Sequence, residues 1–347
     1  MAITLSDVAR AAGVNISTVS RALRGAYGVH RRTRQKVMEA AERLHYRPNR
    51  VARGLATGRS HTLGLIISDI RNPYFAEVAR GAEDAARRAG YDLVLCNADL
   101  DPLKQMRYVR SLLEKRVDGL LMNSVADLNR QQQQELAACG APIVLLNPPG
   151  TGQTFSTVTG DNFEGGRLAG AYLLGLGHRH IAHVTGPRRH GNLAARARGF
   201  LRAMQAAGAR AKAVVIHGAQ SYQGGYEMTR KLLAEHPKVT AIFAGNDAMA
   251  FGAIRAALEA GLAVPEDLSL VGFDNVELSA IIRPPLTTIH QPKYEMGQAA
   301  VEILLRAAGR QGAALPEHLV LGVELVERQS CGAPRPRGAP SASVAAG

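Results

Sequence analysis

The chain is poor in cysteine and has neither a secretory leader nor a long apolar run. Only three cysteines occur among its 347 residues, at Cys96, Cys139 and Cys331, and no Cys-x-x-Cys motif is present. This wide spacing fits a reducing cytoplasm better than an oxidising compartment. No apolar segment is long enough to span a bilayer, and Met1 leads directly into a capped helix. We therefore expect a protein that is neither exported nor embedded in a membrane.

The signatures of several enzyme classes are also missing. The sequence contains no Gly-x-Ser-x-Gly, His-Glu-x-x-His, Walker A or Gly-x-Gly-x-x-Gly motif, so hydrolase, zincin and nucleotide-enzyme functions have no support. His178, His180 and His183 form a His-x-His-x-x-His pattern that resembles a metal site. Because Gly177 should end a helix and a strand should follow it, these imidazoles are expected to diverge. We expect no catalytic residue, no metal and no cofactor.

Positive charge is concentrated at the N-terminus. The whole chain carries a formal charge of +13, of which +9 lies in residues 1–60 and +4 in the remainder. A basic charge gathered in one small unit is typical of phosphate binding, although a solvated basic surface is an alternative. The length and the apolar content of 46% allow two or three domains with cores of their own.

Residues 6–23 predict two short helices joined by a tight turn. Ser6 can cap the first helix, Gly13 can end it, and Asn15 can cap the second. The arrangement fits a helix-turn-helix, whose second helix enters the major groove, although an ordinary αα-corner has the same spacing. Val8, Ala9, Ala12, Val14, Val19 and Leu23 would face inward, while Ile16, Ser17, Thr18, Ser20 and Arg21 would face outward toward bases or phosphates.

A third helix is predicted from about Arg32 to Leu44, with the weak cap His30 before it. The arginine-rich segment 46–60 follows, and alone it should be a frayed linker. On DNA, however, phosphates could neutralise Arg50 and Arg53 so that a helix folds and presents Leu55 as a wedge for a base step. A plain linker is the alternative interpretation.

Beyond residue 62, short apolar runs alternate with amphipathic segments. Buried runs of this kind are typical of parallel strands covered by helices on both faces, so the pattern predicts a βαβ fold. The runs are too many for one open sheet, and a Thr-, Gly- and Ser-rich boundary at 151–159 predicts two similar α/β lobes. The predicted strands are 63–67, 93–96, 119–122, 143–146, 181–184, 214–217, 241–244 and 269–273, and the helix-ending glycines are Gly90, Gly140, Gly177, Gly208 and Gly261.

Polar residues follow many of these strands. Ligands of parallel sheets bind beyond the carboxyl ends of the strands, and short carboxylates and amides with a few aromatic rings suit a hydroxyl-bearing molecule. Any single Asp at such a position can equally be a helix N-cap. The residues at these positions are Asp69, Asn72, Tyr74, Phe75, Asn123, Asn147, Asp161, Gln220, Asn246, Asp247, Asp274 and Asn275.

An ordered set of short motifs closely resembles the lactose/galactose repressor (LacI/GalR) family of bacterial transcription regulators. Each motif alone is weak, but the whole set, spanning about residues 3–329, is specific. The motifs are Asp7-Val8-Ala9, Thr18-Val19-Ser20-Arg21, Tyr46-Arg47-Pro48-Asn49, Asn72-Pro73-Tyr74-Phe75, Gly177-His178-Arg179, Asn246-Asp247 and Val271-Gly272-Phe273-Asp274.

The resemblance implies a helix-turn-helix headpiece at 1–47, a hinge helix and linker at 48–61, and a two-lobed core like a periplasmic sugar-binding protein at 62–329. Lobe 1 would take residues 62–160 and 291–317, lobe 2 residues 161–290 and 318–329, and 330–347 would be a disordered tail. The core would pair two chains, so that two headpieces meet a near-palindromic operator in double-stranded DNA.

The resemblance also implies roles for individual residues. Ile16, Ser17 and Arg21 would read the major groove, and Leu55 would intercalate in the minor groove. The complete set of expected DNA contacts is Ser6, Ile16, Ser17, Thr18, Ser20, Arg21, Asn49, Arg50, Ala52, Arg53 and Leu55. The expected effector contacts are Asp69, Asn72, Phe75, Asn123, Asn147, Asp161, Arg196, Gln220, Asn246, Asp247 and Asp274.

Three departures from the family pattern bear on the ligand and the assembly. Gln220 stands where several relatives have an aromatic ring, which mildly favours a hydrogen-bonded sugar over a purine. Because Arg196 could pair with a carboxylate, an acid effector stays an alternative. Pro148-Pro149 replaces a basic residue of many relatives, so that rim is unusual. The tail lacks leucine heptads, so a dimer is expected.

The predicted function is a cytoplasmic repressor controlled by a small molecule, most simply a sugar or sugar derivative. The alternatives are a nucleoside or organic-acid effector, or an architectural DNA binder without an effector.

Overall fold

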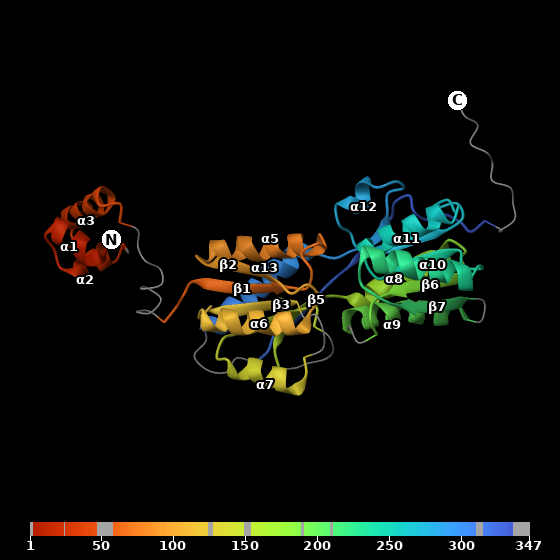
Figure 1. The fold of residues 1–347 in the computed structure, drawn as a ribbon, viewed down its shortest axis with the longest axis horizontal. Helices are drawn as coiled ribbons and strands as arrows, with labels where there is room; N and C mark the ends of the chain where they lie inside the picture. Colours follow the sequence, from red (N-terminus) through yellow and green to blue (C-terminus); the bar gives the residue numbers. More distant parts are fainter. Residues whose placement is uncertain are drawn as a thin grey trace, which may run out of the picture. The chain divides into compact units, whose positions relative to one another are not determined.

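The computed structural model describes residues 3–23, 25–46, 58–123, 128–148, 154–188, 191–208, 211–309 and 315–335. The chain divides into two units, residues 1–60 and residues 61–347. Figure 1 shows that the first unit is helical within its described part and that the second combines helices and sheets. No helix within the described ranges combines the length and the apolar character that crossing a membrane requires.

The described part of the N-terminal unit contains three packed helices, as predicted. They are α1 (Leu5–Ala12), α2 (Ile16–Leu23) and α3 (Arg31–Arg43). Val8, Val19 and Val37, one from each helix, are fully buried and form the centre of a small core completed by alanines. Gly13 ends α1 with a left-handed backbone (φ 66°), which lets α2 begin three residues later.

The first helix is capped by Thr4, which corrects the prediction of Ser6. Thr4 Oγ1 accepts a hydrogen bond from the Asp7 backbone N–H at 3.4 Å, and the Asp7 carboxylate accepts one from the Thr4 backbone N–H at 3.0 Å. This reciprocal capping box satisfies two backbone donors, which outweighs a single cap at Ser6 in the first turn. The cap of α3 is His30, as predicted, whose Nδ1 accepts from the Arg32 backbone N–H at 3.3 Å.

The described residues of the larger unit form two six-stranded sheets. The first is formed by β1 (Thr62–Ile67), β2 (Asp92–Asn97), β3 (Gly119–Asn123), β4 (Ile143–Leu146), β5 (Ser156–Gly160) and β11 (His318–Leu321). The second is formed by β6 (His180–Thr185), β7 (Lys212–His217), β8 (Ala241–Ala244), β9 (Ser269–Asp274), β10 (Thr287–His290) and β12 (Glu324–Val326). The strand orders correspond, β11-β5-β4-β3-β1-β2 and β12-β10-β9-β8-β6-β7, and all pairs are parallel except β10 with β12. The predicted two-lobed parallel architecture is confirmed.

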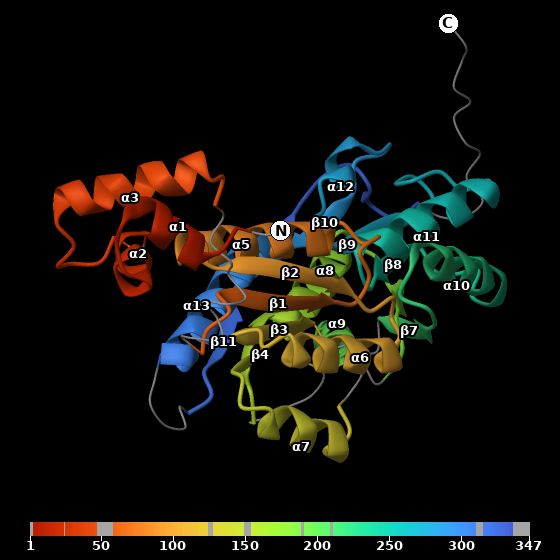
Figure 2. The same ribbon diagram turned by 60° about the vertical axis from the view of Figure 1, so that its left-hand side comes forward.

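Helices cover both faces of each sheet. In lobe 1, α5 (Tyr74–Arg88) and α13 (Lys293–Gly309) pack on the face that carries Leu63 and Leu65, while α6 (Pro102–Glu114) and α7 (Arg130–Ala138) pack on the face of Ile66. In lobe 2, α10 (Tyr222–Glu235) and α11 (Asp247–Glu259) lie on one face, and α8 (Asn162–Gly175) and α9 (Gly191–Ala206) on the other. Figure 2 shows α5 and α6 on opposite sides of β1 and β2. The short α12 (Leu278–Ile281) follows β9.

The chain passes between the lobes three times, after β5, after β10 and between β11 and β12. The strand β11 pairs with β5 in the first sheet, so residues 318–321 lie in lobe 1 and not in lobe 2, where the expected boundary placed them. The strands β5, β10, β11 and β12 were not predicted. The strand β5 begins inside the stretch interpreted as a boundary, and Thr287 and Thr288 interrupt the apolar pattern in β10. The five helix-ending glycines named above all have positive φ, as predicted.

The C-terminal segment is ordered further than expected. Ser330 is fully buried. Its Oγ donates a hydrogen bond to the Leu270 carbonyl oxygen at 2.6 Å and accepts one from the Thr287 backbone N–H at 2.8 Å. Residues 330–335 therefore belong to lobe 2, which corrects the prediction of a disordered tail from residue 330; residues 336–347 lie outside the described residues.

Glycines allow α8 and α9 to approach closely. A Cβ at Gly166 would lie 2.0 Å from the Arg196 carbonyl oxygen, and a Cβ at Gly199 would lie 1.9 Å from the Phe163 carbonyl oxygen. Both obstacles are backbone atoms, which cannot move without shifting a helix. The glycine pair thus fixes the position of Arg196 on α9 relative to α8.

We predict that Gly199→Ala destabilises lobe 2, since the methyl group must push α8 and α9 apart, at a cost of about 1–3 kcal/mol. Thermal unfolding measures the effect. Gly175→Ala is the matched control, because Gly175 is also helical and its Cβ would meet nothing within 4 Å, so this variant should be at least as stable as the parent protein. Equal melting temperatures for Gly199→Ala and Gly175→Ala would contradict the prediction.

Candidate functional site

The second helix of the N-terminal unit presents a polar, exposed face. Ile16 is 51% exposed, Ser17 and Arg21 are exposed, and Thr18 and Ser20 are half-buried. The opposite face of α2 carries Val19 and Ala22, which are buried in the core. The structure thus places the predicted outward residues on the outer side of the helix, where short side chains and one arginine can reach a base edge.

Arg21 holds the loop that follows α2. Its Nη2 donates to the Tyr27 carbonyl oxygen at 2.7 Å, and Arg34 Nη2 donates to the Ala26 carbonyl oxygen at 2.7 Å. Tyr27 itself is 98% exposed. Sequence reasoning did not select Tyr27, because a lone tyrosine in a loop gives no periodic signal.

Ser6 is exposed in the first turn of α1, whereas the remaining predicted DNA contacts cannot be placed. Asn49, Arg50, Ala52, Arg53 and Leu55 lie outside the described residues. Their roles remain predictions from the sequence.

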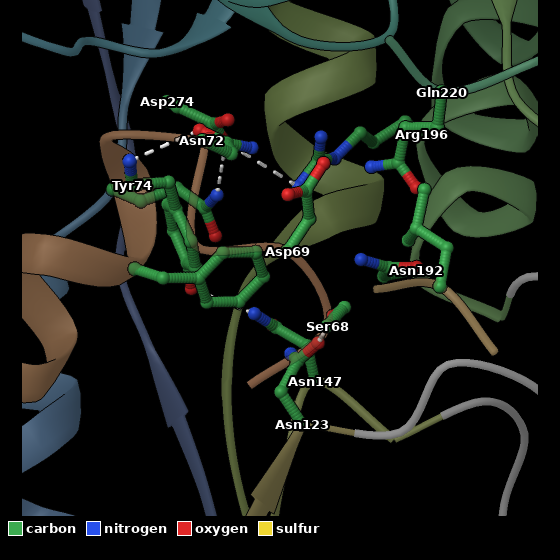
Figure 3. A pocket seen from close by; sticks show the side chains of 13 residues that line it. Ser68, Asp69, Asn72, Tyr74, Asn123, Asn147, Asn192, Arg196, Gln220 and Asp274 are labelled. Atoms are coloured by element: carbon green, nitrogen blue, oxygen red, sulfur yellow. Dashed lines mark hydrogen bonds and ion pairs between the residues drawn. The ribbon is translucent and has the colours of Figure 1, made fainter. Parts of the chain in front are cut away.

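A cavity lies between the two lobes, at the carboxyl ends of the strands. About 560 Å³ of space at this site, open solvent at the mouth included, is free of protein atoms. Figure 3 shows side chains from both lobes converging on it. The lining residues are Ser68, Asp69, Asn72, Tyr74, Phe75, Leu100, Asn123, Asn147, Asn192, Arg196, Gln220, Asp274 and Gln291.

Lobe 1 contributes a network of amides and hydroxyls. Ser68 donates to Asn123 Oδ1, and Asn123 Nδ2 donates to the Leu146 carbonyl oxygen at 3.2 Å. Asn147, in a left-handed conformation directly after β4 (φ 46°), donates from Nδ2 to the Tyr74 hydroxyl at 2.7 Å. Burial raises the pKa of Tyr74, so its hydroxyl stays protonated. These contacts hold neutral hydrogen-bonding groups at one wall of the cavity.

Lobe 2 contributes a buried arginine. Arg196 on α9 is 2% exposed, donates from Nε to Asn162 Oδ1 at 2.8 Å and from Nη1 to the Gly245 carbonyl oxygen at 2.5 Å. Its Nη2 lies 3.8 Å from Asp274 Oδ1, and its guanidinium carbon lies 3.6 Å from the centre of the Phe273 ring. Burial lowers the pKa of Arg196, and Asp274 opposes that shift.

Asp274 connects the cavity to the segment between β10 and α13, where the chain crosses from lobe 2 back to lobe 1. It ends β9 with an unusual backbone (φ 113°), and its Oδ1 accepts from Gln291 Nε2 at 2.7 Å. Lys293 Nζ donates to the Asp274 carbonyl oxygen at 2.7 Å. Burial raises the pKa of the Asp274 carboxyl, and Arg196 is the largest opposing influence. Gln291 and Lys293 lie between β10 and the body of α13, where the chain returns to lobe 1.

Three predicted effector contacts do not line the cavity. Asp161 caps α8 by accepting from the Glu164 backbone N–H at 2.9 Å, and Asn246 caps α11 by accepting from the Met249 backbone N–H at 2.9 Å. Asp247 is fully buried and accepts from the Val276 N–H and from the hydroxyls of Ser279 and Thr288. Asp161 and Asn246 thus act as helix N-caps, the alternative that the sequence left open for residues at strand ends.

Sequence reasoning missed several lining residues. Ser68 directly follows β1 and was in reach of the strand-end rule, whereas Leu100 and Asn192 lie in segments with no such signal. Gln291 follows β10, a strand that was not predicted, so its position at a strand end was hidden.

The histidine pattern at 178–183 has separate partners. His178 Nδ1 lies 2.8 Å from Thr240 Oγ1 and its Nε2 lies 3.0 Å from Ser269 Oγ. His183 Nδ1 lies 2.9 Å from the Phe243 carbonyl oxygen, and its ring stacks on Phe243. Burial lowers the pKa of His183 to about 3, which keeps the ring neutral. Both rings serve packing within lobe 2.

Two protein-family profiles match the chain. The profile of the bacterial regulatory proteins of the lacI family matches residues 4–49, and that of the periplasmic binding protein-like domain matches residues 171–331. Catabolite control protein A of Priestia megaterium is 39% identical over 313 residues, which are 90% of this chain and 94% of that protein.

Solved structures give similar matches. The lac repressor dimer bound to operator and the anti-inducer ONPF aligns with a TM-score of 0.85 and 33% identity, covering 96% of this chain and 100% of that one. A LacI family transcriptional regulator from Enterococcus faecium with bound ribose aligns with a TM-score of 0.71 and 34% identity, covering 79% of this chain and 100% of that one.

We predict that Asp247 makes the core less stable as the pH rises. Burial, assisted by the charge of Asp274, raises the pKa of Asp247 from 3.8 to about 7, so between these values the folded state holds a proton that the unfolded state has lost. Stability attributable to this group is greatest below pH 4 and declines up to pH 7. Asp247→Asn keeps the acceptor for Val276 and Ser279 and can donate to the Thr288 hydroxyl. Melting temperatures at pH 5 and pH 8 should therefore differ less in Asp247→Asn than in the parent protein; an equal or larger difference would refute the assignment.

Proposed function

Since the chain belongs to the LacI family, and is accordingly a DNA-binding transcriptional repressor with an effector domain and not an enzyme, we propose how its residues read DNA and respond to a ligand. The observation that carries the proposal is the cavity between the lobes, whose polar lining is divided between them. A ligand there touches both lobes at once.

The DNA-reading residues are Ile16, Ser17 and Arg21 on the exposed face of α2, with Thr18, Ser20 and Ser6 beside the phosphates. The arginine fork matches the two acceptors of a guanine edge, and short side chains let the helix lie close in the major groove. In the segment behind the headpiece, Arg50 and Arg53 contact phosphates, Asn49 and Ala52 also contact the DNA, and Leu55 inserts at a base step from the minor groove.

The effector is a small polar molecule, most simply a carbohydrate. Asp69, Asn72, Asn123 and Asn147 bind it from lobe 1 and Arg196, Gln220 and Asp274 from lobe 2, with Phe75 against an apolar face. Paired amides and carboxylates suit neighbouring hydroxyls. The Enterococcus faecium regulator that aligns with this chain holds ribose, which makes a monosaccharide a reasonable first probe.

The working unit is a homodimer in the cytoplasm, bound to a near-palindromic operator. Apolar side chains supporting such a pairing are exposed on the edge strand β2 (Val94, Leu95) and on α12 (Leu278, Ile281), each at least 40% exposed. A structure similar to this chain is itself a repressor dimer on operator DNA. The two-fold pairing places two reading helices on two half-sites.

Regulation follows from the ligand's contacts with both lobes. A ligand that binds one lobe angle better than another shifts the equilibrium toward it, and that angle sets the spacing of the segments leading to the headpieces. Coupling of about 1–3 kcal/mol between two sites changes operator affinity by roughly 5- to 150-fold.

We predict that Arg21→Ala weakens specific DNA binding and relaxes base preference at one position, because a bidentate base contact contributes about 1–3 kcal/mol of discrimination. Fluorescence anisotropy at fixed salt, with a duplex selected by the parent protein and with its single-base variants, measures both effects. The control is Arg10→Ala, which removes an 80%-exposed charge from α1. It should lower the affinity for all duplexes by the same factor, if it lowers it at all. An unchanged base preference in Arg21→Ala would show that α2 is misassigned.

We predict that Arg196→Ala abolishes the response of operator affinity to the effector but spares operator binding itself. The substitution removes the only cation among the described lining residues and leaves Asp274 without its ion pair. Asn192→Ala is a milder second variant at a half-buried lining position. It should weaken effector binding without changing the fold of lobe 2. Anisotropy titrations with and without the sugar found by thermal-shift screening test both; a full response in both variants would contradict the proposed cleft.

A further inference from the structure

Lobe 2 contains a long segment without any acidic residue. No Asp or Glu occurs between Glu164 and Glu227, whereas nine Lys and Arg do. The formal charge of this segment, +9, equals that of residues 1–60, so the rest of the chain carries −5. An ordinary soluble surface mixes both signs, whereas a large charge of one sign attracts polyanions. The nine cations are Arg167, Arg179, Arg188, Arg189, Arg196, Arg198, Arg202, Arg210 and Lys212.

Most of the described cations in this segment are exposed and have no carboxylate partner. Two are already engaged, since Arg167 pairs with Glu164 at 2.6 Å and Arg196 belongs to the cleft. Arg189 and Arg210 lie outside the described residues. The others are exposed, and no ion pair joins them to any residue that the structure describes; they are Arg179, Arg188, Arg198, Arg202 and Lys212.

Two of these cations lie on the outer side of α9. This helix packs on β6 and β7 (Figure 1), with Phe200 fully buried against the sheet and Gly199 against α8. Arg198 and Arg202 are one helical turn apart and are both exposed, so they share the flank that neither the sheet nor α8 covers.

Two further cations lie at the edge of the second sheet. The strand β7 is the edge strand, and it begins with the exposed Lys212. The Lys212 backbone N–H donates to the Arg179 carbonyl oxygen at 2.7 Å, so the two residues are neighbours. The Arg179 side chain donates only to carbonyl oxygens, those of Leu174 and His178, which leave its charge uncompensated. We call the four exposed residues of α9 and this edge the lobe 2 basic surface: Arg179, Arg198, Arg202 and Lys212.

The equivalent helix of lobe 1 has a different charge pattern. The helix α5 connects β1 with the edge strand β2, as α9 connects β6 with the edge strand β7. Three acids accompany the three arginines of α5, and Arg87 pairs with both Glu83 and Asp84. The helix α9 has three arginines and no acid. Because like charges four residues apart destabilise a helix, stability does not account for the pair Arg198 and Arg202, whereas an anionic partner does.

The side chains around the lobe 2 basic surface distinguish between anionic partners. The only Phe, Tyr or Trp among residues 186–213 is the buried Phe200, so no ring is available to stack on the bases of a single strand. No large apolar side chain that the structure describes in α9 or β7 is exposed, although protein partners and membrane surfaces use such side chains as anchors. The phosphates of a duplex require only cations and hydrogen-bond donors, and arginine supplies both.

We propose that the lobe 2 basic surface is a second DNA contact, which binds the phosphate backbone of a duplex without reading its bases. It belongs to the effector-binding unit and not to the headpiece, and it does not depend on which bases the headpiece reads. A repressor whose headpieces hold their operator can therefore hold a further duplex. Because only phosphates are contacted, this binding is independent of sequence and falls steeply as salt is added.

The proposal is tested by capture of a second duplex. Full-length protein is loaded on an immobilised duplex that it has itself selected, and a fluorescent duplex of unrelated sequence is then titrated. We expect capture of the second duplex without loss of protein from the first. Four phosphate contacts predict a slope of about −3.6 for log affinity against log salt, which is about a 150-fold loss between 50 and 200 mM.

The triple variant Arg198→Gln/Arg202→Gln/Lys212→Gln should bring that slope to about −0.9 and weaken capture at 50 mM salt by about tenfold or more. Its melting temperature should not fall, because the substitutions remove a repulsion on α9. A second variant, Arg198→Lys/Arg202→Lys, keeps both charges and should keep the slope of the parent protein.

The control is Arg87→Gln/Arg110→Gln/Lys231→Gln, which removes the same formal charge from exposed cations that pair with carboxylates on α5, α6 and α10. This control should capture the second duplex as the parent protein does. Equal losses in the two triple variants, or no loss in either, would overturn the assignment of the surface.

Two further outcomes would overturn the proposal. If the parent protein captures no second duplex, lobe 2 does not bind DNA, although operator binding by the headpiece would stand. If an oligoglutamate peptide displaces the second duplex more effectively than unlabelled duplex of equal charge, the partner is an acidic protein segment and not DNA.

Discussion

The cleft depends on one buried ion pair, between Arg196 and Asp274. Moving two such charges out of water costs several kcal/mol each, and their attraction offsets this only when other hydrogen bonds satisfy the remaining donors and acceptors. Here Asn162, the Gly245 carbonyl oxygen and the Phe273 ring complete the surroundings of the arginine, and Gln291 satisfies the carboxylate. The close contact of Gly166 with the Arg196 backbone keeps the guanidinium in register with them. The pair is consequently a fixed feature of lobe 2 that a ligand meets already formed.

The same pair links the ligand to the passage between the lobes. Gln291 and Lys293, which bind the side chain and the carbonyl oxygen of Asp274, lie where the chain returns from β10 to α13. Any ligand that reaches Asp274 from one side therefore acts on a residue already tied to the connecting segment on the other. Because coupling between sites is reciprocal, operator DNA must alter effector affinity by the same factor as the effector alters operator affinity.

Sequence patterns predicted the architecture better than the boundaries. Apolar runs such as 143–146 and 241–244 match their strands residue for residue, since a strand buried on both faces has no polar positions to blur its ends. Strand β10 escaped because Thr287 and Thr288 are polar, although both are fully buried. At the cleft, the strand-end rule identified Asp69, Asn123 and Asn147 but could not separate Asp161, Asn246 and Asp247, because a cap and a ligand contact use the same residue types. The ion pair between Arg71 and Asp69 is likewise visible only in the three-dimensional structure.

In the DNA contact that we propose for α2, Arg21 exchanges one acceptor for others. In the free headpiece its guanidinium binds the Tyr27 carbonyl oxygen, a contact at the exposed surface that water replaces readily. A guanine edge offers two acceptors in the plane of the fork, so the exchange is favourable only opposite the correct base. Opposite another base, Arg21 can keep its contact with Tyr27, which lowers the penalty for non-specific binding and lets the +9 charge of residues 1–60 act on phosphates alone. In this proposal the intramolecular hydrogen bond separates affinity, which charge supplies, from sequence choice, which Arg21 supplies only when it is released.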